Sequence, residues 1–240
     1  MTSSAAQERH SPQRVALAWG VHVLTASGGV IGVAALLAAG AGDLRIAALL
    51  MLAALAIDSV DGTLARAARV TEVVPGIDGR RLDDIVDYLN YVIVPAVFFV
   101  AAGSLVHWGF AAAPVLASAF GFAQTDAKTE DHFFLGWPSY WNVVALYLFG
   151  LGVPPDVGTA VVVALAAAVF VPLKYVYPSR MHALRRTTTI GGAIWVLLVT
   201  AAFLDPDGDL RKPLLQVSLA FPVYYLAVSL WLGGLHRRSS

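Results

Sequence analysis

Acidic side chains lie inside two long apolar stretches of this chain, where ionisable groups are rare and costly. One stretch ends with Asp58 and Asp61, and the next begins with Asp83 and Asp87. Residues three or four positions apart share one face of a helix, so each pair presents both carboxylates on the same side. Carboxylates that gather in this way repel one another unless a cation compensates them. The spacing therefore predicts a divalent-metal site between two helices.

The residues around the carboxylates indicate what such a site would act on. Oxygen-only ligands suit Mg²⁺ or Mn²⁺, and a pair of these ions can clamp a diphosphate during in-line displacement. Gly62 and Ala65 keep the helix face beside Asp61 slim, so a large ligand can approach the backbone. Arg66 offers a fixed positive charge to a phosphate oxygen, and Gly79 can open the second helix in the same way. The predicted chemistry is phosphoryl transfer from a diphosphate substrate.

The composition places these carboxylates in a membrane protein. Hydrophobic residues make up 58% of the 240 residues and charged residues only 13%. A soluble globule of this length could not bury so much apolar surface. The 16 basic and 16 acidic residues give a net charge of zero, which argues against nucleic acid as a partner. The chain contains no cysteine, which excludes disulfides, thiolate metal sites and cysteine nucleophiles.

Apolar runs of about 17–25 residues are typical of membrane-spanning helices. The sequence predicts an all-α bundle of eight transmembrane helices, two of them short, within a single domain over residues 1–240. A polar tail is expected at 1–14 and a basic tail at 235–240. The predicted spans are 15–39, 44–66, 83–106, 108–125, 139–152, 157–177, 188–204 and 214–234.

Basic residues sort strongly to one side of this predicted bundle. With a cytoplasmic N-terminus, thirteen of the lysines and arginines fall in cytoplasmic segments and three in outer segments. An excess of basic residues marks cytoplasmic loops. The distribution predicts that both termini are cytoplasmic, and it places the four intramembrane carboxylates at the cytoplasmic face.

At the acidic residues the sequence resembles the CDP-alcohol phosphotransferase family. That family's pattern, D-x2-D-G-x2-A-R followed by G-x3-D-x3-D, matches Asp58 to Arg66 and Gly79 to Asp87. The spacer of twelve residues, 67–78, is longer than in most of the family and is similar to the bacterial phosphatidylcholine synthase branch. The stretches 78–88, 124–147 and 177–180 also look like that branch.

The resemblance implies a reaction and a set of roles. CDP-diacylglycerol and choline would give phosphatidylcholine and CMP in a bacterial inner membrane, with two ions of Mn²⁺ or Mg²⁺ as cofactor. Membrane lipids would surround a multi-pass enzyme, and a homodimer is implied because family members are often dimers. The metal ligands would be Asp58, Asp61, Asp83 and Asp87, with Asp87 also the catalytic base. The CDP-binding positions would be Gly62, Ala65, Arg66 and Gly79.

Choline recognition is the second half of this hypothesis. A quaternary ammonium donates no hydrogen bonds, so proteins hold it against aromatic faces with a carboxylate nearby. The candidates for this role are Tyr91, Glu130, Trp137, Tyr140 and Trp141. An aromatic belt at the membrane interface is the alternative explanation for the same residues.

Two other functions stay open on the sequence alone. The same enzyme class could use inositol phosphate, glycerol phosphate or serine, and Arg80, Arg81 and Lys174 would suit an anionic acceptor. A cation transporter could also use intramembrane carboxylates. Transporters, however, tend to place their sites at the membrane midplane between inverted repeats, and no repeat is visible in the sequence.

Overall fold

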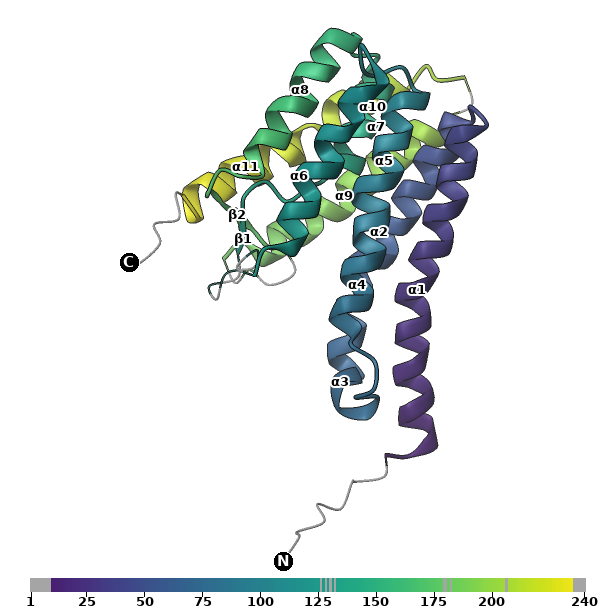
Figure 1. Cartoon of the computed structure of the whole chain (residues 1–240), viewed down its shortest axis with the longest axis vertical. Coiled ribbons are helices and arrows are strands. Elements are labelled where there is room, and N and C mark those ends of the chain that lie inside the picture. Colours follow the sequence, from purple (N-terminus) through teal and green to yellow (C-terminus); the bar gives the residue numbers. More distant parts are fainter. Residues whose placement is uncertain are drawn as a thin grey trace, which may run out of the picture.

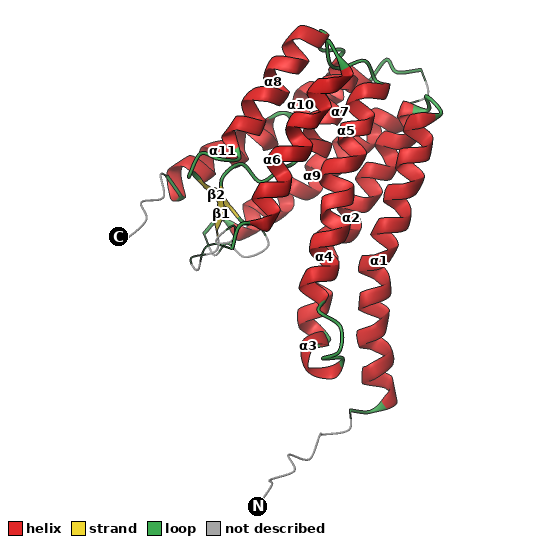
Figure 2. Ribbon diagram, viewed as in Figure 1, coloured by secondary structure: helices red, strands yellow, loops and turns green. Residues whose placement is uncertain are grey.

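The computed structural model describes residues 10–125, 127, 129, 131, 133–178, 181, 183–205 and 207–234. Helices dominate this part of the chain, as Figures 1 and 2 show. The helices are α1 (Pro12–Gly40), α2 (Leu44–Ala67), α3 (Val70–Val73), α4 (Gly79–Tyr88), the π-helix η1 (Leu89–Ile93), α5 (Val94–Ala101), the 3₁₀-helix η2 (Trp108–Ala111), α6 (Ala112–Ala123), α7 (Trp141–Leu151), α8 (Pro155–Ala168), α9 (Arg185–Leu204), α10 (Arg211–Ser218) and α11 (Ala220–Leu232). The strands are β1 (Phe133–Leu135) and β2 (Lys174–Val176).

The helices have the lengths and compositions of a membrane protein. Four helical stretches among the described residues are long and apolar enough to cross a membrane: Pro12–Gly40, Gly79–Ala101, Arg185–Leu204 and Arg211–Leu232. Shorter apolar helices cover Trp108–Ala123, Trp141–Leu151 and Pro155–Ala168. Together with α2, these segments follow the predicted stretches in order along the chain. The helical membrane fold is thereby confirmed, whereas eight crossings and their direction stay predictions.

The region after α8 differs from the prediction. A single helix was expected over 157–177, but α8 ends at Ala168 and the chain continues into β2. This strand pairs antiparallel with β1, with Phe134 opposite Tyr175. Pro172 lacks a backbone N–H and so disfavours a continuing helix. The expected all-α fold therefore carries a small two-stranded sheet, which a run-length argument cannot distinguish from a helix end.

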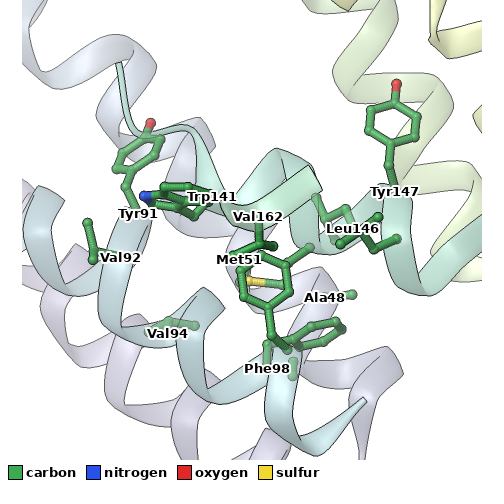
Figure 3. Packing of buried hydrophobic residues seen from close by; sticks show 14 of the residues in the cluster. Ala48, Met51, Tyr91, Val92, Val94, Phe98, Trp141, Leu146, Tyr147 and Val162 are labelled. Atoms are coloured by element: carbon green, nitrogen blue, oxygen red, sulfur yellow. The ribbon is translucent and has the colours of Figure 1, made fainter. Parts of the chain in front are cut away.

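The first helices form an extension of the bundle. In Figure 1, α1, α2 and α4 run together beyond the other helices, and α3 lies near the far end of this extension. A small apolar cluster of α1 and α3 residues, with Val74, packs there. The main core includes residues of α1 and α2 as well as of the later helices, and Figure 3 labels Met51 of α2, Phe98 of α5 and Val162 of α8 within it.

Glycines allow α1 to approach the helix that carries the second acidic pair. A Cβ on Gly28 would lie 3.0 Å from Val86 Cγ1, and one on Gly32 would lie 2.6 Å from Asn90 Oδ1. Asn90 Nδ2 also donates a hydrogen bond of 3.0 Å to the Gly28 carbonyl. Because these two positions have no side chain, α4 and η1 can pack closely against α1.

A π-helical turn, η1, follows the second acidic pair. The Val94 N–H donates to the carbonyl of Leu89, five residues earlier. Pro95 has no N–H and cannot bond the Tyr91 carbonyl four residues earlier, which favours the wider turn at this point. Turns of this kind often occur at functional sites. Here the turn holds Asn90 and Tyr91, both buried, beside the acidic residues.

Candidate metal and substrate site

Three carboxylates from α2 and α4 meet at one point. One oxygen from each of Asp58, Asp83 and Asp87 lies within 4.8 Å of the others. All three residues are half-buried. Helix spacing predicted that these side chains would converge, and the structure brings them together. Hard oxygen donors at this separation can hold a divalent cation.

The fourth predicted ligand, Asp61, is held differently. This residue is 5% exposed, and the Thr25 hydroxyl of α1 donates a hydrogen bond of 2.7 Å to its Oδ2. Asp61 lines the same pocket as the other three carboxylates but is not part of the converging group. Thr25 was not among the predicted site residues, because its contact with Asp61 links positions 36 residues apart.

The pocket beside the carboxylates is small. It lies where α1, α2, α4 and η1 meet, and Thr25, Gly28, Asn90 and Tyr91 line it together with the four acidic residues. Its free volume is about 10 Å³, which is room for one ion or one water molecule. The pocket therefore fits a metal ion, and the bulk of any larger substrate must lie outside it.

Tyrosine rings lead away from the carboxylates toward the C-terminal helix. The Tyr91 hydroxyl donates a hydrogen bond of 2.6 Å to Asp58 Oδ2. The ring centroids of Tyr91 and Tyr140 are 6.2 Å apart, and those of Tyr140 and Tyr225 are 5.8 Å apart. Tyr225 lies in α11 and donates to the Val176 carbonyl of β2 at 3.0 Å. No local pattern in the sequence indicates that α11 contributes to this row.

Two other candidate choline residues, Trp137 and Trp141, do not line the metal pocket. Trp137 and Trp141 pack edge to face, with centroids 4.4 Å apart, and both are buried in the main core. The Trp141 indole N–H donates to Ser118 at 2.7 Å. Figure 3 shows Trp141 and Tyr91 at the same end of that core. Neither tryptophan lines the metal pocket, and Glu130 lies outside the described residues.

Three of the predicted CDP-binding positions lie on the last turns of α2. Gly62 and Ala65 are half-buried, and Arg66 is exposed. The Arg66 side chain donates a hydrogen bond of 2.9 Å to Thr63 on its own helix. These positions follow Asp61 toward the end of α2, so a ligand on the metal pocket could extend over them. Their role in nucleotide binding stays a prediction.

The fourth CDP-binding position, Gly79, begins α4 and faces α1. A Cβ on Gly79 would lie 3.2 Å from His22 Cε1. Asp78 caps the helix, because its carboxylate accepts hydrogen bonds of 3.1 Å from the backbone N–H groups of Arg80 and Arg81. The glycine thus lets the His22 ring lie against the first turn of α4.

Comparison with known proteins adds an independent observation. No family model matches the chain. This chain is 42% identical over 177 residues to a phosphatidylcholine synthase of Legionella pneumophila, and the match covers 72% of this chain and 69% of that protein. The chain is 35% identical to a phosphatidylcholine synthase of Pseudomonas aeruginosa, and the match covers 92% of this chain and 94% of that protein. A phosphatidylcholine synthase of Borreliella burgdorferi is 34% identical, and the match covers 90% of this chain and 94% of that protein.

Proposed function

The chain belongs to the phosphatidylcholine synthases, a bacterial branch of the CDP-alcohol phosphotransferases, and from this premise we propose that it transfers the phosphatidyl group of CDP-diacylglycerol to choline. The products are phosphatidylcholine and CMP. The observation that carries the proposal is the convergence of Asp58, Asp83 and Asp87 at one small pocket. Such a cluster suits a donor whose reacting group is a diphosphate, because a diphosphate needs cationic charge to bind near carboxylates.

The donor set at the pocket fits Mn²⁺ or Mg²⁺. Its ligand atoms are carboxylate oxygens, which these hard cations prefer. We assign Asp58, Asp83 and Asp87 as ligands, with Asp61 as the fourth, and two ions as the cofactor, of which the small pocket has room for one. When bound, the ions offset the negative charge of the diphosphate and stabilise the leaving CMP.

The chain's own residues then act on the acceptor. Asp87 accepts the proton of the choline hydroxyl as general base. The choline oxygen bonds to the phosphorus nearer the lipid while the bond from that phosphorus to the CMP oxygen breaks. Tyr91 holds the Asp58 carboxylate through its hydrogen bond. Gly62, Ala65, Arg66 and Gly79 are assigned to the CDP part of the donor.

The tyrosine row favours a cationic acceptor over an anionic one. Tyr91 and Tyr140 place aromatic rings beside the acidic pocket, which suits a quaternary ammonium. Lys174, which an anionic alcohol could use, pairs instead with Asp131 at 2.6 Å. We therefore assign choline to the side of the pocket facing Tyr91 and Tyr140. The assignments of Glu130, Trp137 and Trp141 rest on the sequence alone.

We propose that the active site lies at the cytoplasmic face of the bacterial inner membrane. The thirteen-to-three distribution of basic residues favours eight crossings with both termini in the cytoplasm. The whole of 1–240 is assigned to one catalytic domain, with tails at 1–14 and 235–240. A homodimer is the proposed assembly. Gly28 and Gly32 already pack within the chain, so the dimer contact is expected on another face.

One assay tests the function directly. Purified protein is incubated with CDP-diacylglycerol, Mn²⁺ and labelled choline, with serine, inositol phosphate and glycerol phosphate in parallel reactions. We expect choline alone to enter lipid, and EDTA to abolish the transfer. Transfer to another alcohol would keep the enzyme class and overturn the acceptor. Metal binding without transfer to any alcohol would favour a cation transporter instead.

A further inference from the structure

A buried histidine on α1 has an unsatisfied ring nitrogen. His22 is 6% exposed, and its Nε2 has no hydrogen-bond partner among the described residues. Buried polar atoms are nearly always hydrogen-bonded, because an unsatisfied one is costly. Trp19 packs edge to face against the ring at a centroid distance of 6.0 Å. The nitrogen therefore has room in its bonding for a partner that the described residues do not supply.

His22 belongs to the face of α1 that borders the metal pocket. Thr25, one turn further along, holds Asp61, and Gly28, another turn further, lines the pocket. The imidazole itself lies against Gly79, with its Cε1 3.2 Å from where a Cβ would be. The histidine therefore lies one helical turn from the carboxylates, at the start of α4.

The charge at this end of α4 indicates which part of a ligand belongs there. The Asp78 carboxylate already caps the helix by accepting from the Arg80 and Arg81 N–H groups. A phosphate placed beside this carboxylate would be repelled, whereas phosphate charge is favoured at the metal site. Gly79 precedes Asp83 by four residues, which is about 6 Å along a helix. That displacement is comparable to the separation between a nucleotide's phosphate and its nucleoside.

We propose that His22 Nε2 hydrogen-bonds the nucleoside part of the bound cytidine nucleotide, while the carboxylates and their metal hold its phosphates. The inference rests on the proposed function, because the nucleotide is the CDP part of the donor and the CMP product. His22 is in this sense a specificity residue. It would distinguish a cytidine nucleotide from any other diphosphate that reaches the metal.

The test compares two ligands that share phosphate chemistry but differ in the nucleoside. CMP and inorganic pyrophosphate are titrated calorimetrically into the purified full chain in the presence of Mn²⁺. We expect His22→Ala to weaken CMP binding about tenfold, the size of one lost buried hydrogen bond. Pyrophosphate binding should not change. The matched control is His107→Ala, which removes an exposed histidine and should alter neither affinity.

Two further titrations identify which part of the nucleotide bonds His22, and several outcomes would contradict the proposal. Loss of the His22→Ala effect with 2′-deoxy-CMP assigns the bond to the ribose, and its loss with UMP assigns it to the base. Unchanged CMP affinity in a folded His22→Ala variant would overturn the inference, as would equal weakening of pyrophosphate. If that variant does not fold, His22→Phe, which keeps a ring but has no ring nitrogen, decides by the same two titrations. Wild-type protein that binds no CMP would instead contradict the proposed function.

Discussion

The Tyr91 hydroxyl supports Asp58, one of the proposed metal ligands, through a hydrogen bond. It donates to Asp58 at 2.6 Å, and such supporting partners typically change metal affinity 10–100-fold. We expect Tyr91→Phe to raise the Mn²⁺ concentration required for half-maximal activity about tenfold. Tyr88→Phe is the control, because Tyr88 donates to the Val115 carbonyl instead. An Mn²⁺ activation curve for each variant measures the effect, and equal curves would show that Tyr91 does not support the site.

Asp87 carries the proposed proton transfer. Asp87→Asn keeps the size of the side chain but removes the base, and we expect turnover to fall by about 100-fold or more. Asp84→Asn provides a control on the same helix, about 100° away from Asp83 around its axis, and should retain most activity. Initial rates at saturating choline compare the two. Substantial residual turnover in Asp87→Asn would rule out the base assignment.

Local spacing predicts some of these residues and not others. Asp58, Asp83 and Asp87 could be predicted because helical periodicity alone decides which side chains share a face. The Thr25 bond to Asp61 could not, because it depends on how α1 packs against α2. The contact between the Trp141 indole and Ser118 could not be predicted either, because it depends on how α7 packs against α6. Composition shows that an aromatic residue is present but not which surface its ring covers.

Among the elements, the close contact between α1 and η1 positions the site. A Cβ on Gly32 would lie 2.6 Å from Asn90 Oδ1, so Gly32→Ala must displace the asparagine or separate the helices. We expect it to destabilise the fold by about 1–3 kcal/mol, the usual cost of overpacking. Gly29→Ala is the control, because its nearest neighbour, Val86, would be 3.9 Å away. Thermal unfolding in detergent should show a lower midpoint for Gly32→Ala alone, and equal midpoints would mean that this contact tolerates a methyl group.

An ion pair connects β2 to the segment that precedes β1. Lys174 Nζ lies 2.6 Å from Asp131 Oδ2, and its hydrogen bond lowers the pKa of the Asp131 carboxyl. A carboxyl with a lowered folded pKa stabilises the fold above its unfolded pKa of about 3.9. This stabilisation is lost as the pH falls through the lowered value. The pair therefore contributes at neutral pH and not in strong acid.

Amide hydrogen exchange checks this pH dependence. We expect Lys174→Met to speed exchange in β1 at neutral pH, because β1 and β2 pair directly. The effect should be small, since Asp131 is exposed and solvent screens the pair. It should shrink toward zero as the pH falls below about 4. Lys212→Met serves as the control, and a Lys174→Met effect that persists unchanged in acid would exclude the ion pair as its cause.

The limits of sequence reasoning about elements have a physical cause. Run length indicates where apolar chain is long enough for a helix, and the observed helices follow those runs closely. It carries no information on how a short apolar segment is hydrogen-bonded. The run 157–177 therefore read as one helix although β2 occupies Lys174–Val176. The partner strand β1 lies about 40 residues earlier, so only the folded chain reveals the pairing.

Across the whole molecule, distant parts of the chain complete one site. The carboxylates belong to the extension formed by α1, α2 and α4, visible in Figure 1. Tyr140 and Tyr225 approach from the segment before α7 and from α11. The pairing of β1 with β2, and the Tyr225 bond to β2, hold α11 in place. The proposed donor side of the site is thus formed by the N-terminal helices, and the proposed acceptor side requires the C-terminal half.

The orientation of the whole bundle can be tested with introduced cysteines, because the chain contains none of its own. Ala41 and Asp207 are exposed and lie in predicted outer loops, whereas Gly76 is exposed in the predicted cytoplasmic loop before α4. We expect a membrane-impermeant maleimide to label Ala41→Cys and Asp207→Cys in cells with a permeable outer membrane. Gly76→Cys should react only after the inner membrane is opened. We expect this labelling pattern because thirteen of the basic residues are predicted to lie on the cytoplasmic side.

The three labels together test both the number of crossings and the side of the active site. Ala41 and Asp207 can share a side only if an even number of crossings separates them, as eight spans require. Labelling on opposite sides would therefore refute the eight-span topology, whatever the orientation. Labelling of Gly76→Cys from outside would place the α2–α4 loop, and with it the acidic cluster, on the outer face. CDP-diacylglycerol would then have to be bound from the outer leaflet, and the cytoplasmic assignment would be wrong.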